Sequence, residues 1–168
     1  MSAEVTIRSN VIQEVTIGTQ TWALYNYDFG GTWADDDIAN LNILGSLYTW
    51  DEAIAIGSSY PGWHLPTLAE ATTLAGYLGG FSVAGGPMKE TGTTYWTTPN
   101  TGATNSTGFG GRASATSLGV NKWEADFWTT EEDSETLAKA MQLKYDNANL
   151  GIISIAKTNR FSIRLIKD

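Results

Sequence analysis

The single histidine of the chain, His64, limits the acid–base chemistry that the sequence can support. Any Ser-His-Asp mechanism would have to pass through it. The segment Gly80-Phe81-Ser82-Val83-Ala84 has the outline of a nucleophile elbow, but that motif needs a preceding strand and a later histidine. Here a helix is predicted before it, and His64 comes earlier in the chain. Because His64 lies between a turn and a helix start, where an imidazole can bond backbone groups, we expect a structural histidine.

Two acidic runs are the next candidates for chemistry, Asp35-Asp36-Asp37 and Glu131-Glu132-Asp133. They could supply oxygen ligands to Ca²⁺, or the acid and base of a glycosidase. The favoured interpretation is that they are solvated acidic loops. Walker, dinucleotide-binding and His-rich metal patterns are absent from the sequence, so no cofactor is predicted, Ca²⁺ has no motif to support it, and a metal site stays unknown.

The segment Lys122–Trp128 interleaves aromatic side chains with carboxylates. Aromatic rings can stack on sugar faces while carboxylates accept hydrogen bonds from hydroxyl groups, so the pattern is typical of ligand recognition. The alternative is that these aromatic residues belong to the core. The glycosylation pattern Asn105-Ser106-Thr107 is interpreted as a turn.

Two helices and several strands must position these residues. The capping-box patterns Thr49–Glu52 and Thr67–Glu70 predict helices at about 50 to 56 and from 67 to about 78. Alternating apolar residues predict short strands within residues 1 to 25, including a hairpin around Gly18, and further strands at 151 to 155 and 161 to 165. Residues 134 to 145 fit either a helix or a strand.

The region from Gly79 to about Gly119 is rich in Gly, Thr, Ser and Asn, which predicts a long loop region. Tyr95, Trp96 and Phe109 interrupt it, and large aromatic residues of this kind anchor loops onto a core. We therefore expect ordered loops here instead of a flexible linker.

Composition restricts the function classes. The chain has 168 residues and a formal charge of −8, which opposes binding to nucleic acid. No apolar stretch is long enough for a membrane span, and the first residues show no signal peptide. The absence of cysteine excludes disulfides, thiol catalysis and thiolate metal sites, and it suits folding in a reducing compartment.

Four segments together resemble one family, the Fibrobacter succinogenes major paralogous domain. They are Val15–Trp22, Gly45–Trp50, Pro61–Thr67 and Phe161–Asp168. The likeness covers residues 15 to 168, which defines the expected domain, with residues 1 to 14 as an N-terminal strand or attachment segment. That family is similar to C-type-lectin-like domains, which implies an α+β fold with two helices, a small twisted antiparallel sheet, long ordered loops and termini brought together. The resemblance also favours strand over helix for Leu137 to Tyr145.

Many members of that family carry cysteines where this chain has Ser59 or Tyr60 and Leu165. The resemblance therefore implies that a disulfide is missing here. C-type-lectin-like domains also include sulfatase-modifying enzymes, whose chemistry needs cysteines or metal-bound thiolates that this chain lacks. The Glu-Pro-Asn and Trp-Asn-Asp calcium motifs of the sugar-binding branch are absent from the sequence.

The resulting hypothesis is a non-catalytic recognition module, the receptor-binding domain of a phage tail fibre or a similar particle, located in the virion or on an extracellular surface and trimeric through the fibre. Its partner would be a host cell-surface glycan or protein receptor, without membrane insertion. The alternatives are a bacterial cell-surface ligand-binding domain, a structural capsid or fibre decoration protein, and a glycosidase that uses the acidic loops. The expected binding face consists of Trp123, Glu124, Asp126, Trp128, Glu131, Tyr145, Asn147 and Asn149.

Overall fold

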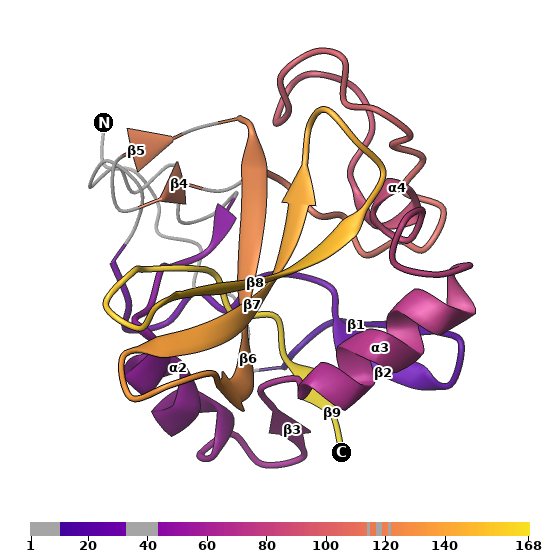
Figure 1. The fold of residues 1–168 in the computed structure, drawn as a ribbon. Helices are drawn as coiled ribbons and strands as arrows, with labels where there is room; N and C mark the ends of the chain where they lie inside the picture. The colour runs from indigo at the N-terminus through magenta and orange to yellow at the C-terminus, as the bar shows by residue number, and fades with distance from the viewer. Residues whose placement is uncertain (1–10, 33–43, 114, 117–118, 121) are drawn as a thin grey trace, which may run out of the picture.

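The computed structural model describes residues 11–32, 44–113, 115–116, 119–120 and 122–168. The strands expected around Val5 and Ile7 and the acidic run 35 to 37 lie outside these ranges. The described chain is an α+β fold with few helices and small antiparallel sheets (Figure 1). This confirms the expected class at that level.

The first sheet joins the two ends of the described chain. Its strand order is β1 (Glu14–Ile17), β2 (Gln20–Ala23), β9 (Ile166–Lys167) and β3 (Trp63–His64). β1 and β2 form the predicted hairpin, and Gly18 turns between them with a φ of 62°, a conformation that glycine adopts without strain. Because β9 pairs with both β2 and β3, the last strand joins β3 to the N-terminal hairpin.

The second sheet is an antiparallel meander of longer strands, β6 (Glu124–Glu132), β7 (Leu137–Lys144) and β8 (Leu150–Ala156). Residues 137 to 144 therefore form a strand, as the resemblance implied, and the strand predicted at 151 to 155 is confirmed. A β-bulge lies between Trp128 and Glu132, where the register with β7 shifts. Figure 1 shows this sheet in front of the first one.

Both predicted helices are present, and both begin at complete capping boxes. α2 (Trp50–Gly57) starts after Thr49, and α3 (Leu68–Tyr77) starts after Thr67. In each, the threonine hydroxyl accepts a hydrogen bond from the N3 backbone amide while the N3 glutamate accepts one from the threonine backbone amide.

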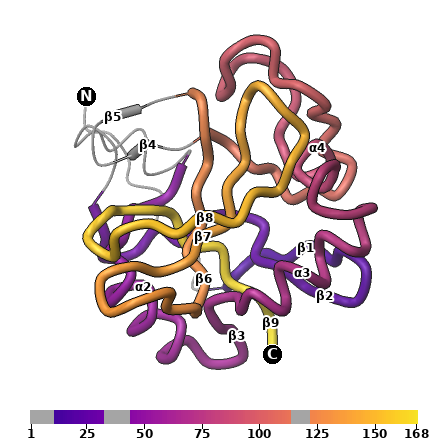
Figure 2. The backbone as a smooth tube through the Cα atoms, in the orientation of Figure 1, coloured from indigo at the N-terminus to yellow at the C-terminus, as the bar shows by residue number. Residues whose placement is uncertain are grey.

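The described part of the long loop region is anchored as predicted, since Trp96 and Phe109 are buried in the core. It also contains a short helix, α4 (Gly85–Met88), and the short strands β4 (Ala115–Thr116) and β5 (Gly119–Val120), which the sequence did not indicate. Figure 2 shows this pink region running beside the orange turn between β7 and β8. The backbone amide of Thr101 donates to the Tyr145 carbonyl, which ties the two segments together.

The strand predicted at 161 to 165 is wrong. Phe161 and Ser162 each make one isolated bridge, to Tyr48 and Phe127, and regular pairing begins only at Ile166. All side chains from 161 to 166 are buried, so the alternation in the sequence does not separate a solvent face from a core face. The segment instead crosses the interior between the two sheets.

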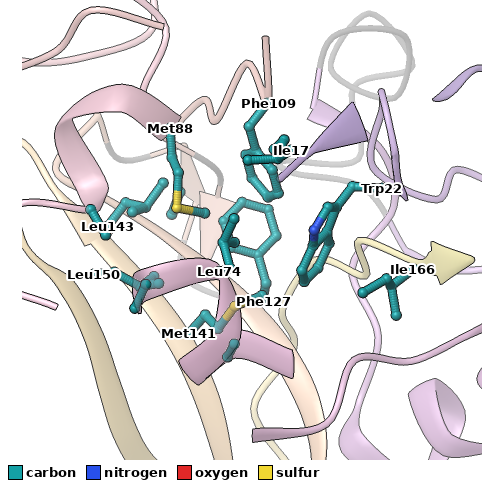
Figure 3. Packing of buried hydrophobic residues seen from close by; sticks show 14 of the residues in the cluster. Ile17, Trp22, Leu74, Met88, Phe109, Phe127, Met141, Leu143, Leu150 and Ile166 are labelled. Atoms are coloured by element: carbon teal, nitrogen blue, oxygen red, sulfur yellow. The ribbon is translucent and has the colours of Figure 1, made fainter. Parts of the chain in front are cut away.

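Two hydrophobic clusters form the core. The first packs α3 against β2, β6 and β7 through residues that include Trp22, Leu74, Phe127 and Met141 (Figure 3). The second packs α2 against the other part of β6 and the segment 161 to 165. β6 contributes to both clusters and therefore lies at the centre of the domain.

Candidate functional site

A surface hollow of about 320 Å³ lies at the open end of the β6–β7 hairpin, where β6 begins and β7 ends. Trp123 precedes β6 and Tyr145 follows β7, and the Tyr145 backbone amide donates to the Trp123 carbonyl at 2.9 Å. This bond extends the ladder by one pair beyond Glu124 and Lys144, so the two aromatic residues lie opposite one another. Lys144, Glu124 and Asp146 complete the lining.

The two aromatic residues of the hollow differ in exposure. Trp123 is 61 % exposed, although most large hydrophobic residues of the domain are buried. Tyr145 is half-buried and packs against the first core cluster. An exposed indole beside a partly fixed phenol ring offers an apolar surface with polar groups around it, and such a surface suits a ligand with both apolar and hydroxyl faces.

Asp126 lies below this surface instead of on it. It is 2 % exposed, and its Oδ1 accepts a hydrogen bond from Gln142 Nε2 at 2.9 Å. The same Gln142 amide lies 3.3 Å from Glu124 Oε2 and links the two carboxyl groups. Burial, together with the neighbouring charge of Glu124, raises the pKa of Asp126 to about 7. Asp126 therefore supports the site from inside and is partly protonated near neutral pH.

Trp128 also does not belong to the expected face. It is fully buried, its Nε1 donates to the Tyr48 carbonyl at 2.7 Å, and its ring lies 4.8 Å from that of Phe161. Residues 125 to 129 are buried on both faces of the strand, because β6 contributes side chains to both core clusters. Trp128 is therefore a core residue, and a role in ligand binding stays a prediction for the exposed Trp123.

Glu131 serves α3. Its Oε2 accepts a hydrogen bond from the Leu68 backbone amide at 2.6 Å, at the positive end of the helix. The rest of the acidic run is also bonded internally, since Glu132 pairs with Lys157 and Asp133 bonds Ser154 and Lys139. These contacts favour a structural interpretation of Glu131-Glu132-Asp133.

Asn147 and Asn149 form the turn that follows Tyr145. Asn147 Oδ1 accepts a hydrogen bond from the Asn149 backbone amide at 2.9 Å, and the Asn147 side-chain amide donates to Asp146 at 2.8 Å. Asn149 is exposed and Asn147 is half-buried. The structure thus gathers Trp123, Glu124 and Tyr145 at one hollow, with this turn next in the chain. Asp126 lies beneath the hollow, and Trp128 and Glu131 lie away from it.

Sequence reasoning missed Lys89, which holds this end of the domain together. Its ammonium group is fully buried and donates to the backbone carbonyls of Thr101, Lys144 and Asn147, each at 2.8 Å. The Trp96 ring lies 5.4 Å from the ammonium. Lys89 is the one basic residue in the sequence between His64 and Arg112, and this was the only available indication of a special role.

His64 is a structural residue, as expected, although it bonds carboxylates and not backbone groups. Its Nδ1 lies 2.7 Å from Asp168 Oδ1 and its Nε2 lies 2.8 Å from Glu70 Oε1. Burial acts to lower the pKa of His64, but the two carboxylates outweigh it and the pKa lies above its ordinary value. Both ring nitrogens are occupied, which links β3, α3 and the end of β9.

No group of three or more His, Cys, Asp or Glu side chains in the described ranges could hold a metal ion. No helix in those ranges is long and apolar enough to cross a membrane.

The fold and the hollow define a small α+β domain with an aromatic surface site. A family model, the Fibrobacter succinogenes major domain, matches residues 15–167. The chain therefore belongs to this family, as its motifs indicated. A comparison with curated proteins finds no match.

Proposed function

We propose that this domain is a non-catalytic recognition module of the C-type-lectin-like type, and that it binds a cell-surface glycan or a protein receptor at the hollow around Trp123 and Tyr145. The observation that carries the proposal is the exposed Trp123 opposite Tyr145, beside the carboxylates of Glu124 and Asp146. Two rigid aromatic residues supply contact area at low entropic cost, and the surrounding polar groups supply directional hydrogen bonds.

The fold assignment within this proposal has its own support. Two capped helices, antiparallel sheets, long ordered loops and a last strand that pairs with the N-terminal hairpin all agree with the C-type-lectin-like arrangement. A superposition of an experimental structure onto lectin-like domains tests it. A different connection between β6–β8 and the helices would contradict it.

The binding proposal is tested with two alanine variants and one matched control. Trp123→Ala and Tyr145→Ala should each weaken binding to host cells, or to a hit on a glycan array, by about tenfold or more. Phe29→Ala is the control, because Phe29 is 77 % exposed and does not line the hollow. Unchanged binding in both site variants, with all three proteins folded, would exclude this hollow as the binding site.

The wider setting that we propose is the distal domain of a phage tail fibre or a similar particle, assembled as a homotrimer. Its support is the analogy with lectin-like fibre tips and a composition without cysteine. Measurement of mass in solution and labelling of the particle test this setting. Binding by a monomer that is exposed on a bacterial surface would favour a cell-surface domain, and a particle location without binding would favour a decoration protein.

A further inference from the structure

A second pocket, of about 160 Å³, lies between the end of β2 and the loop 105 to 112. Arg164, Arg112, Glu90, Tyr25 and Asn26 contribute to its lining, and it shares no lining residue with the hollow around Trp123. Two guanidinium groups therefore reach one small pocket in a chain whose net charge is −8. Such a grouping of positive charge in an acidic protein is a candidate site for an anion.

Arg164 is the more unusual of the two cations, because it is buried among neutral groups. It is 2 % exposed, and its Nε donates to Asn26 Oδ1 at 2.9 Å. Its Nη1 donates to the backbone carbonyls of Ala23, Leu24 and Phe109. The guanidinium lies 4.2 Å from the centre of the Phe109 ring. No carboxylate among the described residues forms an ion pair with it, whereas buried charges are ordinarily paired.

One side of the Arg164 guanidinium is available to a ligand. A guanidinium has donors on three nitrogens, and Nε and Nη1 use theirs on the protein. Nη2 makes no hydrogen bond within the described part of the chain, yet it is not among the buried atoms that lack a partner. Since Arg164 lines the pocket, solvent reaches Nη2 through it.

Arg112 and Glu90 set the charge that the pocket can accept. Arg112 Nε donates to Glu90 Oε2, and the Arg112 guanidinium stacks on the Tyr95 ring at 4.4 Å. Among the described residues that line the pocket, Glu90 pairs with Arg112, and Arg164 forms no ion pair with a carboxylate. Burial, with a smaller effect of Arg112, lowers the pKa of Arg164 to about 9, which agrees with a cation that lacks an anionic partner. Among the described lining residues, two arginines stand against one glutamate, and this balance suits a singly charged anion better than a doubly charged one.

We propose that this pocket binds the carboxylate of an acidic sugar, a uronate, with Nη2 of Arg164 as its buried donor. A planar carboxylate fits the fork of donors that a guanidinium presents. Tyr25, which is 44 % exposed, lies at the pocket and provides an aromatic surface for the sugar ring. Gly110 leaves room at the pocket, since a Cβ there would meet only the Gly108 carbonyl, at 3.9 Å.

The direct test is a titration of the full chain with glucuronate, followed by NMR or calorimetry. Glucuronate should bind at least tenfold more tightly than glucose, which has the same ring without the carboxylate. Acetate and inorganic phosphate are the other arms. Phosphate binding equal to or tighter than glucuronate binding would overturn the assignment to a carboxylate. Glucuronate binding no tighter than that of glucose would overturn the anion site altogether.

Variants place the binding at this pocket. Arg164→Gln removes the buried donor but also four hydrogen bonds, so it can fail to fold. Arg112→Gln, at a partly exposed residue, is the informative variant and should weaken glucuronate binding at least tenfold. Glu90→Gln removes the opposing charge and should preserve or strengthen it.

The control variant is Arg160→Gln, because Arg160 pairs with Glu52 on α2 and does not line the pocket. It should leave glucuronate binding unchanged. Equal weakening in the Arg160 and Arg112 variants would reveal nonspecific attraction and contradict the proposal. Trp123→Ala should also leave glucuronate binding unchanged, so failure of this site and failure of the hollow around Trp123 are distinguishable.

Discussion

At the scale of single residues, Lys89 has the least freedom to change. Its three ammonium protons match three backbone carbonyls that converge from the loop, from the end of β7 and from the β7–β8 turn. Burial lowers the pKa of its ammonium to about 8, so part of the hydrogen-bond energy offsets the cost of desolvation. The net effect depends on what replaces the ammonium.

Lys89→Met should lower the free energy of unfolding by about 2 to 4 kcal/mol, because methionine keeps the volume but leaves three buried carbonyls without donors. Urea unfolding followed by circular dichroism measures this change. Lys122→Met, at an exposed position, is the matched control and should change stability by less than about 0.5 kcal/mol. Equal stability of the two variants would mean that water replaces the ammonium at no cost.

Asp126 predicts a pH dependence of stability. Its pKa is about 7 in the folded chain and close to its ordinary value of 3.8 in the unfolded chain, so the folded state prefers the protonated acid. The contribution of Asp126 is therefore most favourable below about pH 4 and is lost as the pH rises towards 7. Asp126→Asn imitates the protonated acid and should remove this loss.

Relative to the unchanged chain, Asp126→Asn should be more stable at pH 8 by up to about 4 kcal/mol and nearly equal at pH 4. Urea titrations at the two pH values measure the difference. Glu135→Gln, at an exposed carboxyl, controls for the loss of one negative charge. The expectation fails if the stability difference between the Asn variant and the unchanged chain is the same at both pH values.

At the scale of elements, sequence patterns predict an element correctly where the interactions that form it lie within a few residues. Thr49 and Thr67 were identified as helix starts because a capping box is contained within four residues. The segment 161 to 165 was misread because its neighbours come from distant parts of the chain and cover both of its faces. For the same reason, Trp123 and Trp128 could not be told apart, although one is exposed and the other is buried.

The cap of α3 should be worth a measurable share of stability. Thr67→Ala removes the hydroxyl that accepts from the Glu70 amide at 3.1 Å and that donates to the Glu70 carboxylate at 2.9 Å. We expect a loss of about 1 to 2 kcal/mol in unfolding free energy, with recovery in Thr67→Ser. Thr72→Ala, in the exposed middle of the same helix, should cost less than about 0.5 kcal/mol. Similar losses at Thr67 and Thr72 would argue against a specific capping effect.

At the scale of the whole molecule, two of the three positions where the resemblance implies cysteines, Tyr60 and Leu165, lie in one environment, whereas Ser59 is exposed. Leu165 is buried in the second core cluster, and Tyr60 packs against the same cluster. Burial of a leucine and an aromatic side chain supplies stability without a covalent link. The family resemblance identifies these positions from the sequence. It does not show that Tyr60 and Leu165 meet at one cluster, because they are far apart in the chain.

The two core clusters should unfold as one unit, because β6 and the segment 161 to 166 contribute to both. Leu74→Ala in the first cluster and Leu65→Ala in the second should each lower the unfolding free energy by about 2 to 4 kcal/mol. Each variant should shift a single transition, seen at the same midpoint by far-ultraviolet circular dichroism and by tryptophan fluorescence. If the clusters were independent, Leu65→Ala would melt α2 and its surroundings first while the signal from α3 and Trp22 persisted. Coincident midpoints in both variants therefore distinguish one cooperative domain from two subdomains that share a chain.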